Sequence, residues 1–222
     1  MDYLFLSSTT LFRGITPEEI QTMMGCLQGI TKEYPRESII HHFGECISTL
    51  GLVLSGSVSV ENDDIWGNKT ILDKIGVGNT FAENYACLPG EPLMVNIVAA
   101  EAAEILFLNT EYMLRVCSRT CGFHNRLINN MLTISAQKNL NLSRRSLHTG
   151  PKTIRGRLLS YLSNQAVHHG SREFDIPFNR QQLADYLNVD RSAMSNELSK
   201  MQKEGQIISE RNHFRILNMQ VH

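Results

Sequence analysis

Residues 180–199, RQQLADYLNVDRSAMSNELS, constrain the fold more than any other stretch, because they are typical of two short amphipathic helices joined by a tight turn. Apolar residues recur at helical spacing on both sides of that turn: Leu183, Ala184 and Leu187 before it, and Val189, Met194 and Leu198 after it. We place the small side chain of Ala184 at the helix crossing and Asn188 in the turn, where the backbone must be left-handed. The pattern predicts a helix-turn-helix.

The ends and the outer face of this motif suit contact with nucleic acid. Asn179 and Gln182 have the spacing of a capping box for the first helix, and Asp190, which we include in the predicted DNA-binding set, can cap the second. We expect base contacts from Arg191, Ser192, Ser195 and Asn196, and phosphate contacts from Asn179, Arg180, Gln181 and Lys200. An ordinary helical hairpin with a solvated face is the alternative.

Two short strands are expected after the second helix. Residues 206–209 and 213–217 alternate around the polar turn Glu210-Arg211-Asn212, which is typical of a winged helix. The motif, the wing and the long preceding segment together resemble the Crp/Fnr superfamily, that of the cyclic-AMP receptor protein and the fumarate and nitrate reductase regulator. The residues that carry this resemblance most strongly are Arg180, Gln181, Leu183, Ala184, Leu187, Val189, Asp190, Arg191 and Leu198.

The resemblance spans essentially the whole chain and implies an α+β protein in three parts. Residues 1–110 would form an effector-sensing antiparallel β jelly roll similar to the cyclic-nucleotide-binding domain, residues 111–147 a dimerisation helix and hinge, and residues 148–222 a winged helix-turn-helix DNA-binding domain. It implies a sequence-specific transcriptional regulator rather than an enzyme. The implied partners are double-stranded DNA, RNA polymerase, a second copy of the chain and a small-molecule effector.

Charge is divided unevenly along the 222 residues, although the formal net charge is only −1. Residues 147–222 hold ten Lys or Arg against seven Asp or Glu, whereas residues 1–146 hold eleven against fifteen, so the carboxy-terminal part suits phosphates better. The segment MDYLFLSSTTLF lacks the basic stretch of a secretory signal. Apolar runs such as 94–100 are far shorter than the roughly 20 residues that span a bilayer. We therefore expect a cytoplasmic protein without membrane contact.

Short apolar segments separated by turn residues fill the region from 35 to 108, which is typical of a β roll. Gly56 precedes the alternation Val58-x-Val60, a turn is expected at Trp66-Gly67-Asn68, and residues 76–83 carry the pattern Gly-x-Gly-x-x-Phe-x-Glu. These glycine-marked turns resemble those of the cyclic-nucleotide-binding fold. Any other small antiparallel barrel is the alternative.

One departure from that fold concerns the ligand. Nucleotide-binding members follow the glycine-glutamate segment with an Arg-Ser pair that holds the cyclic phosphate, whereas this chain has Pro92-Leu93-Met94-Val95-Asn96. Burying an unpaired anion there costs several kcal/mol, which argues against cyclic AMP or cyclic GMP. We expect an uncharged or differently charged small molecule, or a pocket filled by side chains. The candidate pocket residues are Phe81, Glu83, Asn84, Tyr85, Met94, Asn96 and Ile128.

Other sensing chemistries find weaker support in the sequence. The five cysteines are an odd number without CxxC spacing, and only Cys26 precedes Cys46, so we expect no structural zinc, disulfide framework or iron–sulfur cluster. Cys117 and Cys121 could form a redox pair but are more typical of packing thiols. Haem ligation by His41, His42 or His124 stays open by residue type alone. A metal-dependent jelly-roll enzyme is the remaining alternative, but adjacent histidines on a strand point to opposite faces.

Residues 110–145 are expected to be helical, with an apolar seam at Phe123, Leu127, Met131 and Ile134. We expect this narrow seam to pair with a second copy, as the dimer helix of the resembling family does, with packing between domains as the alternative. Ile128, Leu132 and Ser135 would partly face the pocket. The polar stretch 141–152, which contains Gly150-Pro151, is expected to break the helix as a hinge, so that an effector repositions two recognition helices.

Overall fold

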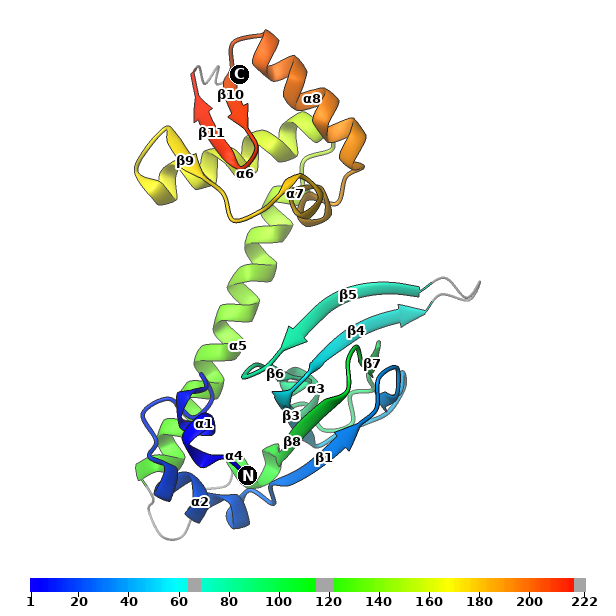
Figure 1. Ribbon diagram of the computed structural model, residues 1–222, viewed down its shortest axis with the longest axis vertical. Helices are drawn as coiled ribbons and strands as arrows, with labels where there is room; N and C mark the ends of the chain where they lie inside the picture. Colours follow the sequence, from blue (N-terminus) through cyan, green and yellow to red (C-terminus); the bar gives the residue numbers. More distant parts are fainter. Residues whose placement is uncertain (64–68, 115–121, 218–222) are drawn as a thin grey trace. The chain divides into compact units, whose positions relative to one another are not determined.

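Two four-stranded antiparallel sheets form a β roll in the computed structural model, which describes residues 1–63, 69–114 and 122–217. The strand order of the first sheet is β1 (Ile30–Tyr34), β8 (Ala103–Asn109), β3 (Thr49–Ser55) and β6 (Thr80–Phe81). That of the second is β2 (Ile39–His41), β7 (Asn96–Ala99), β4 (Ser57–Asp63) and β5 (Lys69–Gly76), with the long β4–β5 hairpin at its edge (Figure 1). The predicted jelly roll is confirmed, while the turn expected at Trp66–Asn68 lies outside the described residues.

Alternation along the strands explains how the roll closes. One face of the first sheet points into the roll and carries Val53 of β3 and Ile105 and Phe107 of β8. These side chains share an apolar cluster with residues of the second sheet, such as Val58 and Ile97. Gly56 lies between β3 and β4 with a φ of 74°, and a Cβ there would lie 2.1 Å from a backbone oxygen. A glycine is therefore required where the chain passes from one sheet to the other.

The opposite face of the first sheet is covered by helices. Leu50, Leu52 and Leu108 point away from the roll interior and join a second apolar cluster with α1 (Tyr3–Ser8) and α2 (Pro17–Cys26). Helix α2 starts with a capping box between Thr16 and Glu19. Two further short helices, α3 (Glu83–Ala86) and α4 (Thr110–Leu114), belong to the same part of the chain.

The apolar seam of α5 (Gly122–Thr149) packs inside its own unit, which corrects the prediction that it faces a second copy. Leu127 and Met131 are 0% and 5% exposed in the cluster that contains α1 and α2, and Phe123 and Ile134 pack against that cluster. The reason is the amino-terminal helical segment, which folds over this side of α5. Its helices are too short for their periodicity to stand out in the sequence.

Helix α5 continues to Thr149. The predicted break over residues 141–149 is therefore wrong, because these polar residues are helical. Most of these residues are exposed, and polar side chains on the solvent side of a helix are compatible with it. The helix ends just before Gly150, and the Thr153 hydroxyl then caps α6 (Ile154–His169) by accepting from the Gly156 amide at 3.0 Å. The chain divides into two compact units, residues 1–137 and 138–222, so the end of α5 belongs to the second unit.

The second unit is a winged helix-turn-helix, as predicted. After α6 come β9 (Glu173–Asp175), α7 (Arg180–Leu187), α8 (Arg191–Lys203) and a wing made of β10 (Ile207–Glu210) and β11 (His213–Ile216). The three strands form one antiparallel sheet in the order β10-β11-β9. A single apolar cluster joins the helices to this sheet and includes Leu158, Leu183, Leu198 and Phe214.

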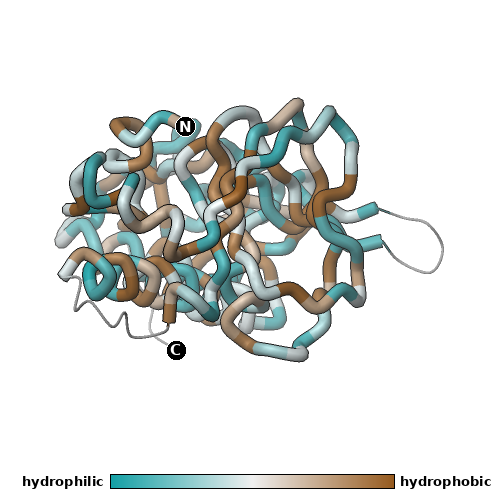
Figure 2. Tube along the Cα trace, turned by 90° about the horizontal axis from the view of Figure 1, so that it is seen from below, coloured by the Kyte–Doolittle hydropathy of each residue, from teal (hydrophilic) through white to brown (hydrophobic). Residues whose placement is uncertain are grey.

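Hydrophobic stretches along the chain are short and alternate with hydrophilic ones (Figure 2). Among the described residues, the structure contains no helix with both the length and the apolar character needed to cross a membrane.

Candidate nucleic-acid interface

The two helices of the motif begin at side-chain caps, as the sequence predicts. The Asn179 side chain accepts from the Gln182 amide, and the Gln182 side chain accepts from the Asn179 amide, both at 2.9 Å. Asp190 accepts from the Ala193 amide at 2.8 Å and from the Ser192 hydroxyl at 2.5 Å. These two hydrogen bonds, led by that from Ser192, lower the pKa of Asp190. Ser192 therefore takes part in the cap of α8, and its contact with a DNA base stays a prediction.

The turn between α7 and α8 has the predicted geometry. Asn188 has a φ of 53° in the left-handed region, and Ala184 is fully buried where the two helices meet. Two arginines close this end of α7. Arg145 of α5 donates to the carbonyl oxygens of residues 185–186 at 3.0 and 3.1 Å, and Arg157 of α6 donates to those of residues 187–188 at 3.0 and 2.7 Å. They satisfy the last carbonyls of the helix and complement its dipole.

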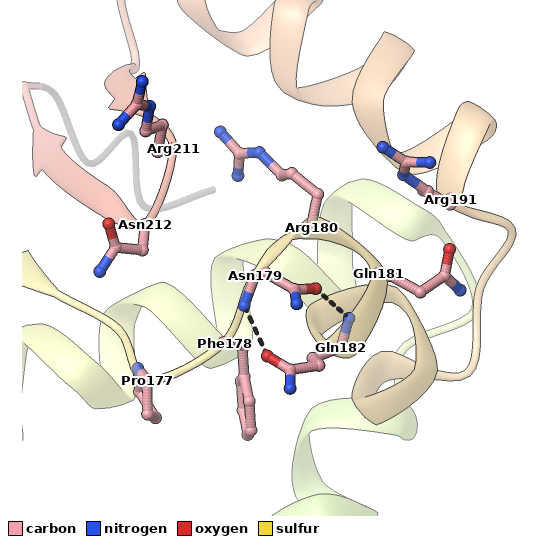
Figure 3. A pocket seen from close by; sticks show the side chains of 9 residues that line it. All are labelled: Pro177, Phe178, Asn179, Arg180, Gln181, Gln182, Arg191, Arg211 and Asn212. Carbon is pink, nitrogen blue, oxygen red and sulfur yellow. Dashed lines mark hydrogen bonds between the residues drawn. The ribbon is translucent and has the colours of Figure 1, made fainter.

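A groove of about 830 Å³ lies between the start of α7, the start of α8 and the turn of the wing. Its lining residues, shown in Figure 3, are Pro177, Phe178, Asn179, Arg180, Gln181, Gln182, Arg191, Arg211 and Asn212. Three of these nine are arginines, so the groove suits a polyanion. Four of them, Asn179, Arg180, Gln181 and Arg191, were predicted from the sequence. Arg211 and Asn212 were missed, and their only signal was a place in the polar turn of the wing.

The remaining predicted contacts lie farther along α8. Ser192, Asn196 and Lys200 are exposed and Ser195 is partly buried. The Lys200 ammonium lies 3.8 Å from the Glu197 carboxylate, a loose surface pair that leaves it available to a phosphate. The structure thus places the predicted base-contacting residues on one helix whose start lines the groove.

Arg180, a predicted phosphate contact that lines the groove, also has partners within the protein. In Figure 3 its guanidinium points toward the turn of the wing. It donates to the Ser209 hydroxyl and lies 5.0 Å from the ring centroid of Phe214. The side chain is partly buried, and this burial lowers the pKa of Arg180. The phosphate contact stays a prediction from residue type, and these tertiary neighbours come from strands about 30 residues away in sequence.

The predicted effector-pocket residues have different surroundings in the structure. Phe81 and Glu83 are buried, and Tyr85 packs against the apolar cluster of the roll. Asn84 is exposed and Met94 is 66% exposed, so these two side chains face solvent.

The other two candidates, Asn96 and Ile128, lie on β7 and on α5. The Asn96 amide donates to the Asp63 carboxylate at 2.9 Å, and its oxygen accepts from the Phe43 amide at 2.8 Å. Ile128 is a partly buried residue of α5. In the stretch 92–96, which the resemblance sets against the family's Arg-Ser pair, Leu93 is buried in the roll core and Met94 is 66% exposed.

A separate cavity of about 470 Å³ lies in the first unit beside α3 and α4. It is lined by Ile47, Ser48, Ala86, Cys87, Pro89, Thr110, Glu111 and Leu114. Burial, and to a lesser degree the Glu83 carboxylate, raise the pKa of the Cys87 thiol, which makes it a poor nucleophile. The predicted thiol pair Cys117 and Cys121 lies outside the described residues.

The three candidate haem ligands have different surroundings. His41 hydrogen-bonds through Nδ1 to Glu45 at 3.0 Å and packs edge-on against Phe107. His42 is exposed. His124 is buried, and its Nε2 lies 3.1 Å from the Met113 carbonyl oxygen. Within residues 1–63, 69–114 and 122–217 the structure shows no group of three or more His, Cys, Asp or Glu side chains that could hold a metal ion.

Comparison with known proteins agrees with both halves of this architecture. The model of the Crp-like helix-turn-helix domain matches residues 156–221, and that of the cyclic nucleotide-binding domain matches residues 31–120. The solved structure of CprK complexed with OCPA is 16% identical, with a TM-score of 0.61 over 89% of this chain and 92% of that one.

A second solved structure, the c-di-GMP responsive global regulator CLP of Xanthomonas campestris, is 16% identical, with a TM-score of 0.53 over 89% of this chain and 98% of that one. At such identities the likeness to solved structures concerns the fold. A search of the curated proteins found no match.

Proposed function

We propose that this chain, which belongs to the Crp/Fnr family of DNA-binding transcriptional regulators, acts in the cytoplasm as a homodimer that binds a two-part operator and contacts RNA polymerase. A signal in the first unit shifts the paired α5 helices, and the two copies of α8 then enter successive major grooves about one DNA turn apart. A coupling free energy of about 1 to 3 kcal/mol between the two events suffices for a useful switch.

The observation that carries this proposal is the arginine-lined groove between α7, α8 and the wing. Arg191 at the start of α8 has the donors for a bidentate contact with guanine, and Asn196 has the donor and acceptor for adenine. Each such contact contributes about 1 to 3 kcal/mol of discrimination. We assign Lys200 and the wing residue Arg211 to phosphate contacts, which fix register without reading sequence.

A second stripe of α5, beside its buried seam, supports a dimer. Ile128, Leu132, Ser135, Asn139, Leu142 and Ser146 follow one another at steps of four and three residues, the spacing of a coiled-coil seam. Leu132 is 59% and Leu142 is 63% exposed in the single chain. Exposed leucines at this spacing are what a second copy of the same helix would cover.

The effector we propose is not a cyclic nucleotide held as in the nucleotide-binding members. The stretch 92–96, which corresponds to the family's Arg-Ser pair by resemblance, contains no Lys or Arg, and Leu93 in it is part of the apolar core. An anionic phosphate buried there would have no counter-charge. The ligands named for the two structural relatives, OCPA and c-di-GMP, differ from each other, which fits a fold whose effector changes from member to member. Calorimetric titration with cyclic AMP tests this point, and micromolar binding would overturn it.

A gel-shift selection on fragments of the source genome, followed by sequencing, tests the whole proposal. We expect a two-fold symmetric site to be enriched. Arg191→Ala should relax base preference at one position of each half-site, whereas Lys200→Ala should weaken all sequences alike and lower the salt slope by about one. Failure to retard any fragment, at low ionic strength and with cell extract present as a source of inducers, would refute the proposed function.

A further inference from the structure

We infer that side chains join the last turn of α5 to the end of α7, and that this joint carries a displacement of α5 to the recognition helix α8. The joint consists of Arg145 and His148 of α5, Arg157 of α6 and residues 185–188, and it lies within the second unit. The inference rests on the proposed function and deepens it, because it names the residues through which a signal reaches the DNA-contacting helix.

Arg145 and His148 lie one turn apart on α5, and both contact α7. The Arg145 guanidinium donates to the carbonyl oxygens of Asp185 and Tyr186 at 3.0 and 3.1 Å. The ring centroid of His148 lies 6.1 Å from that of Tyr186 and 5.5 Å from that of Tyr161 in α6. Helix α5 therefore holds the end of α7 through both its main chain and an aromatic side chain.

Apolar packing contributes little to holding this part of α5. Among residues 138–149, all of which the structure describes, only His148 is buried. The three leucines of this stretch are 50%, 63% and 69% exposed in the single chain. Ser160 of α6 adds a polar contact, because its hydroxyl lies 3.1 Å from Nδ1 of His148. The attachment of α5 to the motif thus depends on Arg145 and on the surroundings of His148.

Arg157 links the segment between α5 and α6 to the turn of the motif. Its Nε donates to the carbonyl oxygen of Pro151 at 2.9 Å, and its Nη1 donates to those of Leu187 and Asn188 at 3.0 and 2.7 Å. Pro151 also packs on Gly156, where an added Cβ would lie 2.9 Å from the proline side chain. One guanidinium therefore holds the connecting segment and the turn together.

The residues that receive these contacts lie directly before the recognition helix. Asn188 is the left-handed C-cap of α7, Asp190 caps α8, and the predicted base contact Arg191 is the first residue of α8. Both arginines of the joint bind main-chain carbonyl oxygens, so a displacement of α5 moves the backbone of α7 and not merely a side chain that can rotate. A shift of α5 thus turns the start of α8 and changes the separation of the two recognition helices in a dimer.

Charge-conserving variants test the joint on DNA. Lysine keeps the charge of arginine but lacks its planar set of donors, so Arg145→Lys combined with Arg157→Lys loosens the joint without altering the attraction to phosphates. On the operator selected by gel shift, we expect the double variant to lose about tenfold in affinity, because the two half-sites are no longer bound at a fixed separation. On a duplex with one half-site, its affinity should stay within about twofold of the wild type. One base pair inserted between the half-sites should weaken the wild type more than the double variant.

Arg144→Lys is the matched control, because Arg144 is the exposed neighbour of Arg145 and belongs neither to the joint nor to the predicted DNA contacts. It should leave both affinities and the spacing preference unchanged. If the double variant loses equally on the operator and on the half-site and keeps the wild-type spacing preference, the arginines only stabilise the motif and the inference is overturned. Wild-type affinity of the double variant for both duplexes overturns it as well.

Amide hydrogen exchange of the free, full-length protein separates the inference from the proposed function. The amides of Asn188 and Val189 donate to carbonyl oxygens of α7, and that of Gly150 donates to the last turn of α5, so they report on the two sides of the joint. Arg145→Lys alone, which keeps Arg157 if the double variant folds poorly, should raise exchange on both sides by about threefold. A rise confined to the α5 side overturns the inference. If the wild-type chain binds no DNA, the proposed function fails, while exchange still decides whether the joint holds α5 to α7.

Discussion

Arg155 and Glu204 form a two-point ion pair, in which Nη1 and Nη2 of the guanidinium donate to the two carboxylate oxygens at 2.7 and 2.9 Å. Nε of the same arginine donates to Glu197 at 2.5 Å. Glu197 lies within α8 and Glu204 is its C-cap, whereas Arg155 belongs to α6. The recognition helix is thus held to its supporting helix at two places along its length.

We predict that Arg155→Met lowers DNA affinity several-fold for all sequences alike, because α8 loses orientation rather than a base contact. Glu204→Gln should have a smaller effect in the same direction, since an amide keeps only part of the pairing. Affinity measured for the two single variants and the double variant gives their coupling. Additive losses would show that the two residues act independently. A changed base preference in Arg155→Met would contradict the orienting role.

We predict that acidification destabilises the second unit through His148. It is buried against Tyr161 and Tyr186, and this burial lowers its pKa below the usual 6.5. As the pH falls below about 6.5, the unfolded chain binds the proton first, so the free energy of unfolding decreases. His148→Gln should reduce this loss. Denaturant unfolding at about pH 7.5 and about pH 5.5 measures it, and an unaltered pH dependence in the variant would disprove the assignment.

For His213 we predict the opposite pH dependence of stability, because its pKa is raised. It lies 2.9 Å from Asp175 and 3.2 Å from Glu173, and these partners, Asp175 first, raise the pKa of its imidazole above 6.5. The charged form therefore stabilises the β9–β11 pairing fully below about pH 6.5, and this stabilisation disappears as the pH rises through the raised pKa. His213→Gln should destabilise the unit at low pH and change little at about pH 9. NMR titration of the imidazole checks the direction of the pKa shift directly.

The motif at 180–199 was predictable because its information is local. Capping at Asn179, the left-handed Asn188 and the buried Ala184 follow from spacing and side-chain chemistry within 20 residues of sequence, and the structure has all three. Local patterns also predicted the order of the two motif helices and the two strands of the wing.

The predictions that failed depend on partners distant in sequence. Periodicity identified the apolar seam with Leu127 and Met131, but not that the amino-terminal helices would cover it. The partners of Arg180 within the protein, Ser209 and Phe214, could likewise not be seen from its type and position, while its phosphate contact stays a prediction. Which face of an element is apolar can be seen in a sequence, but what packs on that face requires the tertiary structure.

Ala82 predicts a stabilising substitution in the first unit. It precedes α3 with a φ of 62° and a ψ of 8°, a left-handed conformation that costs a residue with a Cβ about 1 kcal/mol or more. Ala82→Gly removes that strain but adds entropy to the unfolded chain, so we expect a net gain of up to about 1 kcal/mol. Ala136→Gly in the exposed part of α5 is the matched control and should destabilise by about 1 kcal/mol. Thermal unfolding of both variants decides the sign, and a lower melting temperature for Ala82→Gly would contradict the prediction.

Leu132 predicts where the dimer can be broken. Its side chain is 59% exposed and does not belong to the buried seam of α5, so a charge there does not disturb the core of a single chain. In a dimer paired through Leu132 and Leu142, however, Leu132→Glu would place two carboxylates at the interface without counter-charges. We expect this variant to sediment as a folded monomer at concentrations where the wild type is a dimer.

Leu88→Glu is the control for that substitution, because Leu88 is 58% exposed in the first unit, away from α5 in sequence and outside the proposed seam. It should leave the sedimentation coefficient unchanged. DNA affinity should fall steeply for Leu132→Glu, since a monomer binds only one half-site. If Leu132→Glu remains a dimer while a charged substitution at Leu127 dissociates it without unfolding, the seam assigned from the sequence, and not the exposed face, would be the dimer contact.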